Sequence, residues 1–333
     1  MPADIKWCKI SEKPQQREGI RKEAINNMRK RLLFVFNPRS GKGQIKNNLL
    51  DIIDTFVKGG YEVMVHPTQG PKDGYQMVKE MVQGMDLIVC SGGDGTLDEV
   101  VTALMEKKAA VPLGYIPAGS TNDFANSLDI SKDMVAAARD IMEGQLYSCD
   151  VGSFNGDTFV YIAAFGLFTD VSYQTSQNLK NLLGHLAYVM EGAKRIFDVK
   201  SYWMRIETQD RVLEGEYIYG MITNSHSVGG FKNLTGSGVE MNDGLFEVTL
   251  IKKPKNLLEL NEIIASLLSA NDNTEMIDAF KTDRLKLESL ENIAWTLDGE
   301  FGGEHTQVEI ANKKQALDIL LNPQQEQPPL VKE

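Results

Sequence analysis

The chain has 333 residues, is 42% hydrophobic and 24% charged, and carries a formal net charge of −11. This composition is typical of a globular protein, and the acidic balance argues against nucleic acid as a partner. Three scattered cysteines argue against a disulfide framework and against a thiolate zinc site. No apolar run approaches the length of a membrane span, and no secretory signal is apparent, so we expect a cytoplasmic protein.

Residues 1–30 form a polar extension with a basic balance. Residues 1–31 hold nine Lys or Arg against four Asp or Glu. Two interpretations stay open for this segment: a solvated extension, or a basic amphipathic helix that contacts a membrane surface or a partner.

Strands and helices alternate from residue 31 onward. Short apolar runs predict strands at 31–36, 61–66, 86–90 and 112–116, and periodic segments predict helices at 43–60, 72–84, 96–108 and 133–144. This alternation predicts a doubly wound parallel sheet, forming an α/β nucleotide-binding domain over 31–148. Ligands bind beyond the carboxyl ends of such strands. The Gly- and Ser-rich segments 37–43, 91–95 and 117–123 therefore share one edge.

The turn at 91–95, "SGGDG", combines glycines with a carboxylate between a buried strand and a helix. Glycines let an anion approach backbone N–H groups, and the helix N-terminus favours a phosphate there. Asp94 would repel a phosphate unless Mg²⁺ lay between them. Alternatively, Asp94 is only a helix cap. The sequence of this turn does not match the dinucleotide-binding motif, and "FNPRSGKG" does not match the P-loop motif.

The second half of the chain predicts an all-β architecture. Strand-like segments with intervening turn residues occur at 146–154, 157–166, 202–208, 211–223, 244–251, 283–289, 292–298, 306–311 and 316–321. We expect an antiparallel β-sandwich domain over 149–314 with helical insertions at 171–198 and 256–270. Residues 315–325 are expected to return to the first domain. Residues 326–333 have the composition of a disordered tail.

Six segments in order resemble the diacylglycerol kinase catalytic family, and most closely its bacterial lipid kinases. They are "FNPRSGKG", "SGGDGTLDEVV", "LGYIPAGSTNDFANSL", "CDVGSF", "NDGLFEV" and "TLDGE", and the resemblance covers about residues 31–320. The glycine–aspartate turn alone is shared with NAD kinases and phosphofructokinases, but the six segments together are specific.

The resemblance implies ATP and Mg²⁺ as cofactors and a set of ATP-contacting residues. They are Asn37, Pro38, Arg39, Ser40, Gly41, Lys42, Thr68, Gly92, Gly93, Asp94, Gly95, Thr96, Leu97, Asp98 and Ser120. Ser120 stands where the family usually has Thr, a mild departure because either hydroxyl can donate to phosphate. Asn122 and Asp123 are expected to cap the following helix.

The resemblance also implies the residues that act on the acceptor and hold a structural metal. Glu300, in "TLDGE", would accept the hydroxyl proton, with Asp94 as its catalytic partner; without the resemblance, this segment predicts an exposed hairpin turn. A structural Mg²⁺ would be held by Asp243, by the carbonyls of Glu240 and Leu245, and through water by Asp150. Glu240 departs from the small residue usual there.

We therefore expect an ATP- and Mg²⁺-dependent lipid kinase that acts at a membrane surface, with diacylglycerol as the family's default substrate. Another lipid alcohol, a soluble hydroxyl substrate as in NAD kinases, and a non-catalytic nucleotide or lipid sensor are the alternatives. Peripheral contact would use the extension and basic residues near 180–200 and at Lys252, Lys253 and Lys255. The sequence is also compatible with a homodimer.

Overall fold

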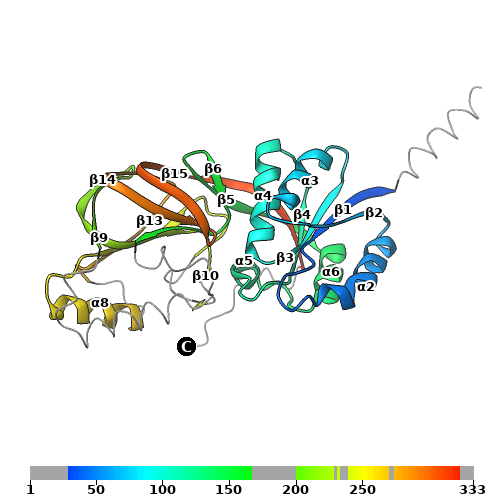
Figure 1. Ribbon diagram of the computed structural model, residues 1–333, viewed down its shortest axis with the longest axis horizontal. Helices are drawn as coiled ribbons and strands as arrows, with labels where there is room; N and C mark the ends of the chain where they lie inside the picture. The colour runs from blue at the N-terminus through cyan, green and yellow to red at the C-terminus, as the bar shows by residue number, and fades with distance from the viewer. Residues whose placement is uncertain (1–28, 167–199, 229–230, 233–238, 270–273, 323–333) are drawn as a thin grey trace, which may run out of the picture.

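The protein has an α/β part followed by a strand-rich part, arranged along the long axis of the molecule (Figure 1). The computed structural model describes residues 29–166, 200–228, 231–232, 239–269 and 274–322. The extension over 1–28, the expected helical insertion at 171–198 and the tail at 326–333 lie outside the described residues.

The α/β part is built on a parallel sheet with the strand order β2-β1-β3-β4. These strands are β1 (Lys30–Phe36), β2 (Tyr61–Pro67), β3 (Leu87–Gly92) and β4 (Leu113–Pro117). Helices α3 (Asp73–Met81) and α4 (Asp94–Lys107) contact each other on one face, and α2 (Ile45–Lys58) and α6 (Met134–Glu143) contact each other on the other (Figure 1). The sequence prediction of parallel strands alternating with helices is confirmed.

The strand order fixes where a ligand can enter. The chain leaves β1 outward to β2 and then crosses back to β3, so its direction of winding reverses between β1 and β3. Phe36 at the end of β1 is paired with Ser91 of β3. Crevices at such reversal points, beyond the carboxyl ends of the strands, are the ligand sites of open parallel sheets.

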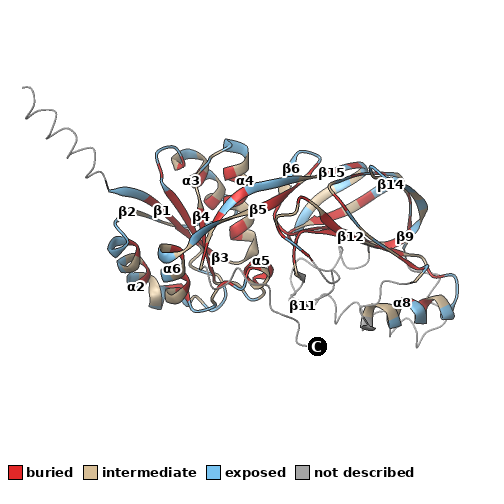
Figure 2. Ribbon diagram, turned by 180° about the vertical axis from the view of Figure 1, so that it is seen from behind, coloured by how far each residue is buried: buried red, intermediate tan, exposed pale blue. Residues whose placement is uncertain are grey.

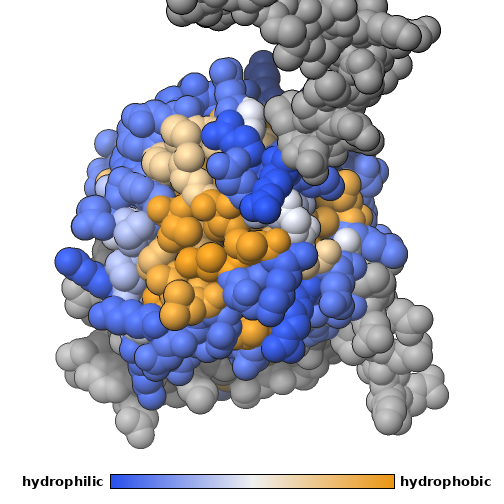
Figure 3. Space-filling model, turned by 90° about the vertical axis from the view of Figure 1, so that its right-hand side faces the viewer, coloured by the Kyte–Doolittle hydropathy of each residue, from blue (hydrophilic) through white to orange (hydrophobic). Residues whose placement is uncertain are grey.

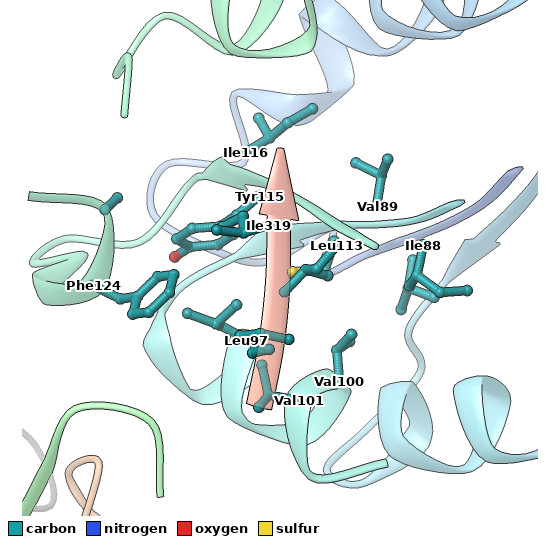
Figure 4. Packing of buried hydrophobic residues seen from close by; sticks show 14 of the residues in the cluster. Ile88, Val89, Leu97, Val100, Val101, Leu113, Tyr115, Ile116, Phe124 and Ile319 are labelled. Carbon is teal, nitrogen blue, oxygen red and sulfur yellow. The ribbon is translucent and has the colours of Figure 1, made fainter. Parts of the chain in front are cut away.

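Helix α4 is anchored by an apolar face. Leu97, Val100 and Val101 are fully buried and lie against the sheet together with Ile319 (Figure 4). Figure 2 shows the same division across the α/β part, with buried residues along the strands and exposed residues on the outer helix faces. Burying each such side chain contributes about 1.5–3 kcal/mol, so the N-terminus of α4 is held rigidly at the sheet edge.

The strand-rich part is antiparallel in all its internal pairings described here. Its long strands are β5 (Gln145–Phe154), β9 (Val212–Thr223), β14 (Arg284–Leu297) and β15 (Glu300–Leu321). Shorter strands are β6 (Asp157–Phe159), β7 (Ile162–Gly166), β8 (Tyr202–Glu207), β10 (Ser227–Val228), β11 (Phe231–Lys232), β12 (Phe246–Lys252) and β13 (Ile277–Thr282). Helix α8 (Leu257–Ser269) matches the predicted insertion at 256–270.

Two long strands of this part change pairing partners along their length. Both β9 and β14 pair with β8 through their first halves and with β7 through their second halves. The two strands predicted at 283–289 and 292–298 are therefore the single strand β14, whose register shifts between Glu288 and Ile293. The predicted boundary reflects that bulge, because an irregular pairing interrupts the apolar alternation without ending the strand.

Strand β15 links the two parts. After pairing with β14, it runs on beside β5, and Ile319 near its end lies opposite Leu113 of β4 in a parallel register. Residues 317–321 thus extend the sheet of the α/β part, at the position of the expected return of 315–325.

One side of the α/β part is not uniformly polar. On the side that faces away from the strand-rich part, apolar residues gather in one area with hydrophilic residues around it (Figure 3). Leu50 and Val57 of α2 are among the exposed large apolar residues of the α/β part. Within the described residues, no helix is long and apolar enough to cross a bilayer.

Candidate active site

Three loops converge at the carboxyl edge of the parallel sheet, as the sequence predicts. The Asn37 N–H donates to the Ser91 carbonyl at 2.8 Å, and the Ala118 N–H donates to the Gly92 carbonyl at 2.8 Å. The Gly93 N–H donates to Oγ of Ser40 at 3.2 Å. The segments after β1, β3 and β4 are therefore one hydrogen-bonded unit at the reversal point of the sheet.

Glycines make this convergence feasible. Gly41 has φ +54°, and a methyl group built on it would lie 2.4 Å from the Ala118 carbonyl oxygen. A methyl group on Gly119 would lie 2.6 Å from Cα of Gly93. Both neighbours are backbone atoms that cannot rotate away, so the loops approach more closely than side chains would permit.

Asp94 begins helix α4 directly after the Gly93 cap. The backbone N–H groups of Asp123 and Phe124 hydrogen-bond to its carboxylate, whose Oδ1 is buried and has no hydrogen-bond partner. Burial, and then the nearby charge of Asp123, raise the pKa of Asp94 to about 6. An orphaned carboxylate oxygen beside the phosphate-type loops fits a divalent cation, because Mg²⁺ takes oxygen ligands and one or two carboxylates.

Asn122 stands at the N-cap position of helix α5 (Asp123–Ser127), as predicted, but its side chain does not make the cap bond. Asn122 adopts φ +54° and makes no side-chain cap bond. Its Oδ1 instead accepts from the Gly119 N–H and its Nδ2 donates to the Gly119 carbonyl, both at 2.9 Å. The side chain thus closes the 119–122 turn, and Asp94 from another helix meets the first N–H groups of α5.

Glu300 approaches the same turn from the strand-rich part. It begins β15 after the β14–β15 hairpin turn, and its side chain is exposed. A methyl group built on Gly95 would lie 3.8 Å from Oε1 of Glu300. The structure therefore brings Glu300 next to Asp94 and Gly95, which lie more than 200 positions earlier in the chain.

The other predicted nucleotide residues lie around this centre with different exposures. The Thr68 N–H donates to the Phe36 carbonyl at 2.9 Å, next to the first loop. Asn37 Oδ1 accepts from the Arg39 N–H and shapes the turn at Pro38. Side chains that are exposed toward solvent belong to Arg39, Lys42 and Ser120.

Thr96, Leu97 and Asp98 belong to the first turns of α4. Leu97 is fully buried in the core, so its side chain faces away from any nucleotide. The Thr96 and Leu97 N–H groups donate to the Gly93 carbonyl at 3.0 and 3.1 Å. Asp98 hydrogen-bonds to Asp298 of the hairpin turn.

Asp243, expected at a structural Mg²⁺, is already compensated by protein groups. Its Oδ1 accepts from the Leu245 N–H at 2.8 Å, and its Oδ2 lies 3.3 Å from the Lys281 ammonium. Its carbonyl accepts from the Lys314 ammonium at 3.1 Å. Two lysines at one aspartate do not fit a Mg²⁺ at the same place, and we derive no step through such an ion.

Asp150 and Glu240 complete the expected metal set. Asp150 is fully buried, and its oxygens accept from the backbone N–H groups of Gln315 and Gly244 and from Nδ2 of Asn312. Glu240 is exposed. Among the residues that the structure describes, no group of three or more His, Cys, Asp or Glu is arranged to hold a metal ion.

A cavity of about 340 Å³ lies away from this chemistry. It is lined at the C-terminal end of α4 by residues such as Leu104 and Lys108, and by Leu317 of β15. Asp94 is at the opposite end of the same helix. The cavity therefore belongs to the other edge of the sheet.

Two acidic residues of the site were not identified from the sequence. Asp123 was interpreted only as a cap, yet its charge acts on Asp94. Asp298 belongs to the quoted "TLDGE" segment, which the residues alone predict as an exposed hairpin turn, but the structure buries this side chain. Its signal was the apolar run "NIAWTL" before it, which leads the chain out of the core directly into the turn.

The α/β part carries phosphate-type loops at its carboxyl edge and the strand-rich part brings Glu300 to them. Comparisons with known proteins identify the family. The family model "Diacylglycerol kinase catalytic domain" matches residues 31–154. A diacylglycerol kinase of Bacillus subtilis (strain 168) is 35% identical over 277 residues, covering 82% of this chain and 91% of that protein. One of Staphylococcus saprophyticus is 33% identical over 280 residues, covering 83% and 91%. The chain belongs to the diacylglycerol kinase family and is a lipid kinase.

Solved structures share the fold. A diacylglycerol kinase crystal structure from Bacillus anthracis str. Sterne has a TM-score of 0.69 at 20% identity and covers 89% of this chain and 98% of its own. A second crystal structure from that organism has a TM-score of 0.74 at 22% identity and covers 89% and 99%. At these identities, the likeness supports the two-part architecture alone.

Proposed function

We propose that the enzyme transfers the γ-phosphoryl group of ATP, with Mg²⁺, to the free hydroxyl of diacylglycerol and so forms phosphatidate. The observation that carries this proposal is the approach of the Glu300 carboxylate to Gly95 at the N-terminus of α4. A proton acceptor beside a phosphate-binding turn is the minimum that transfer to a neutral alcohol requires.

The phosphate chain would lie on backbone N–H groups at the edge of the sheet. Segments 40–43 and 93–96 supply glycines and a helix N-terminus, and Lys42 supplies an exposed positive charge. The orphaned Oδ1 of Asp94 would hold Mg²⁺. Bound there, Mg²⁺ would neutralise the charge that phosphate oxygens carry in transfer.

The acceptor hydroxyl would approach from the side of the hairpin. As its oxygen forms the bond to the γ-phosphorus, the bond from that phosphorus to the leaving oxygen of ADP breaks. Glu300 receives the hydroxyl proton. Its exposed side chain suits this role because a lipid headgroup must reach it from outside. In a non-catalytic sensor, a carboxylate beside Gly95 would only repel the bound phosphates.

A lipid-panel assay tests the substrate. Purified enzyme is incubated with γ-labelled ATP and Mg²⁺ and with diacylglycerol, a polyprenol, a sphingoid base or NAD, and labelled products are separated. We expect labelled phosphatidate as the main product, and none without Mg²⁺. Efficient labelling of another acceptor with none of diacylglycerol would replace the substrate, and labelling of NAD alone would return the enzyme to the soluble-substrate class.

Contact with the membrane is proposed to be peripheral and electrostatic. Two of the candidate lysines already form ion pairs within the protein: Lys252 with Asp278 at 3.0 Å, and Lys253 with Glu216 at 3.1 Å. The candidates at 180–199 and 1–28 lie outside the described residues. Each Lys or Arg near an anionic surface contributes about 1 kcal/mol, so vesicle binding should weaken as salt rises.

A further inference from the structure

Asp298 is a buried acid with several hydrogen bonds at the junction of the two parts. It is 4% exposed, and its carboxylate accepts from the backbone N–H groups of Val160, Tyr161 and Ile162 at 2.5, 2.9 and 2.9 Å. Its own N–H donates to the Ile162 carbonyl at 2.9 Å. The hairpin turn that carries Glu300 is therefore tied to the start of β7.

Asp298 also contacts helix α4. The side chains of Asp98 and Asp298 hydrogen-bond to each other, and Oγ1 of Thr102 lies 3.5 Å from Oδ1 of Asp98. Asp98 lies one turn after Asp94 on α4, and Asp298 lies two residues before Glu300. The contact thus joins the helix that begins at the phosphate turn to the turn that presents the proton acceptor.

Two carboxyl groups can form this hydrogen bond only if one carries a proton. Burial, followed by the charge of Asp298, raises the pKa of Asp98, while the three backbone N–H groups that donate to Asp298 favour its ionised form. Two other acids are near this pair: the charge of Glu99 acts on Asp98, and Asp94 lies close enough to interact with Asp298. Asp98 is accordingly the donor at neutral pH.

We propose that protonated Asp98 donates to Asp298 and that this carboxyl–carboxylate link positions Glu300 over the first turn of α4. The link rests on the proposed role of Glu300. It assigns Asp98 to positioning in place of the predicted contact with ATP, and Asp298 to the same task. A displacement of about 1 Å in a catalytic group can lower a rate about 100-fold, so a fixed hairpin matters.

A double-mutant cycle tests the link. Asp98→Ala removes the donor, Asp98→Asn keeps a donor that cannot ionise, and each is made with Glu300 intact and as Glu300→Gln. The control is Glu106→Gln, which removes a carboxylate near the end of α4 whose partners are Tyr75 and Lys79. Initial rates with diacylglycerol and labelled ATP give kcat and the KM for ATP, and melting curves verify folding.

With Glu300 intact, we expect Asp98→Ala to lower kcat on the order of 10- to 100-fold with little change in the KM for ATP. In the Glu300→Gln background, the same change should lower kcat far less, because there is no base left to position. Asp98→Asn should keep most of the activity and remove a decline in kcat that the wild type shows at alkaline pH, where Asp98 loses its proton.

Each contrary result has a distinct meaning. An equal loss from Asp98→Ala in both backgrounds would overturn the positioning link while leaving Glu300 as the base. A raised KM for ATP with unchanged kcat would return Asp98 to the nucleotide site. An Asp98→Asn enzyme as impaired as Asp98→Ala would exclude a neutral donor, and Asp298→Asn repeats the test from the other side if Asp98→Ala fails to fold. Full activity of Glu300→Gln would refute the proposed base itself.

Discussion

Replacing Glu300 by Gln is the most direct perturbation of the proposed chemistry. The two side chains have nearly the same shape, and Glu300 is exposed, so the change leaves no cavity and no buried unpaired charge. Exposed substitutions of this kind alter the free energy of unfolding by at most about 0.5 kcal/mol. The melting temperature should therefore stay close to that of the wild type.

The rate should respond very differently. Loss of a positioned general base lowers the rate about 10²–10⁴-fold, which at 1.36 kcal/mol for each factor of ten corresponds to about 2.7–5.4 kcal/mol of activation free energy. Glu300 approaches Gly95 from the hairpin and is not part of the nucleotide loops. The loss should therefore appear in kcat and leave the KM for ATP nearly unchanged.

The assay measures phosphatidate formation from labelled ATP at saturating and limiting ATP. Glu304→Gln is a matched control, because Glu304 is an exposed acid on the same strand, paired with Ala294. It should behave as the wild type. A Glu300→Gln enzyme with near-normal kcat, or with a raised KM for ATP as its only defect, would refute the general-base reasoning.

Three further predictions concern the loops and the buried charges. Asp94→Asn should abolish transfer without loss of stability above about pH 6; because burial raises the pKa of Asp94, the ionised form costs folding energy as pH rises, and the amide removes that cost. Activity and melting curves at pH 8 test this. Gly119→Ala should destabilise the protein by about 1–3 kcal/mol and weaken ATP binding, since its methyl group would meet Cα of Gly93 at 2.6 Å; urea unfolding and ATP titration measure both. Lys281→Met leaves buried Glu247, 3.0 Å away, without its cation. The free energy of unfolding should fall by about 1–3 kcal/mol above pH 7. The loss should shrink at lower pH, because burial raises the pKa of Glu247 to about 7 and the carboxylate then takes up a proton. Equal losses at pH 6 and pH 9 would contradict that cause.

The architecture could be predicted where the information is local. The alternation of buried strands and amphipathic helices over 31–144 depends on spacing within short windows, and the Gly-rich loops follow from it. Strand β13 (Ile277–Thr282) was not predicted, because its two charged residues, Asp278 and Lys281, break the apolar pattern and each forms an ion pair with a residue of β12, whose pairing defines the strand. Pairing between strands that are distant in the sequence cannot be predicted from the residues of either strand alone.

The site shows the same limit at the level of single side chains. The motif order predicted that Asp94 and Glu300 serve one site, and their approach at Gly95 agrees with this. The burial of Asp298 could not be predicted, since it depends on three N–H groups from residues 160–162, some 137 positions away. The position of Asn122 at the start of α5 was predicted, but its side-chain partner was not, because the amide bonds back to the N–H and carbonyl of Gly119 instead of to the helix.

The crowding of acids at this junction also indicates which one is available to a cation. Asp94, Asp98, Asp123 and Asp298 lie close together here: the charges of Asp123 and Asp298 raise the pKa of Asp94, and the charge of Asp298 raises the pKa of Asp98. Three backbone N–H donors stabilise the ionised form of Asp298, and burial raises the pKa of Asp98, which favours its protonated form. Of these four carboxyl groups, Asp94 alone has a buried oxygen with no hydrogen-bond partner. A buried, unpaired carboxylate oxygen is unfavourable in the protein by itself, so the repulsion that the other acids impose is best relieved by a cation at Asp94, where the phosphate loops meet.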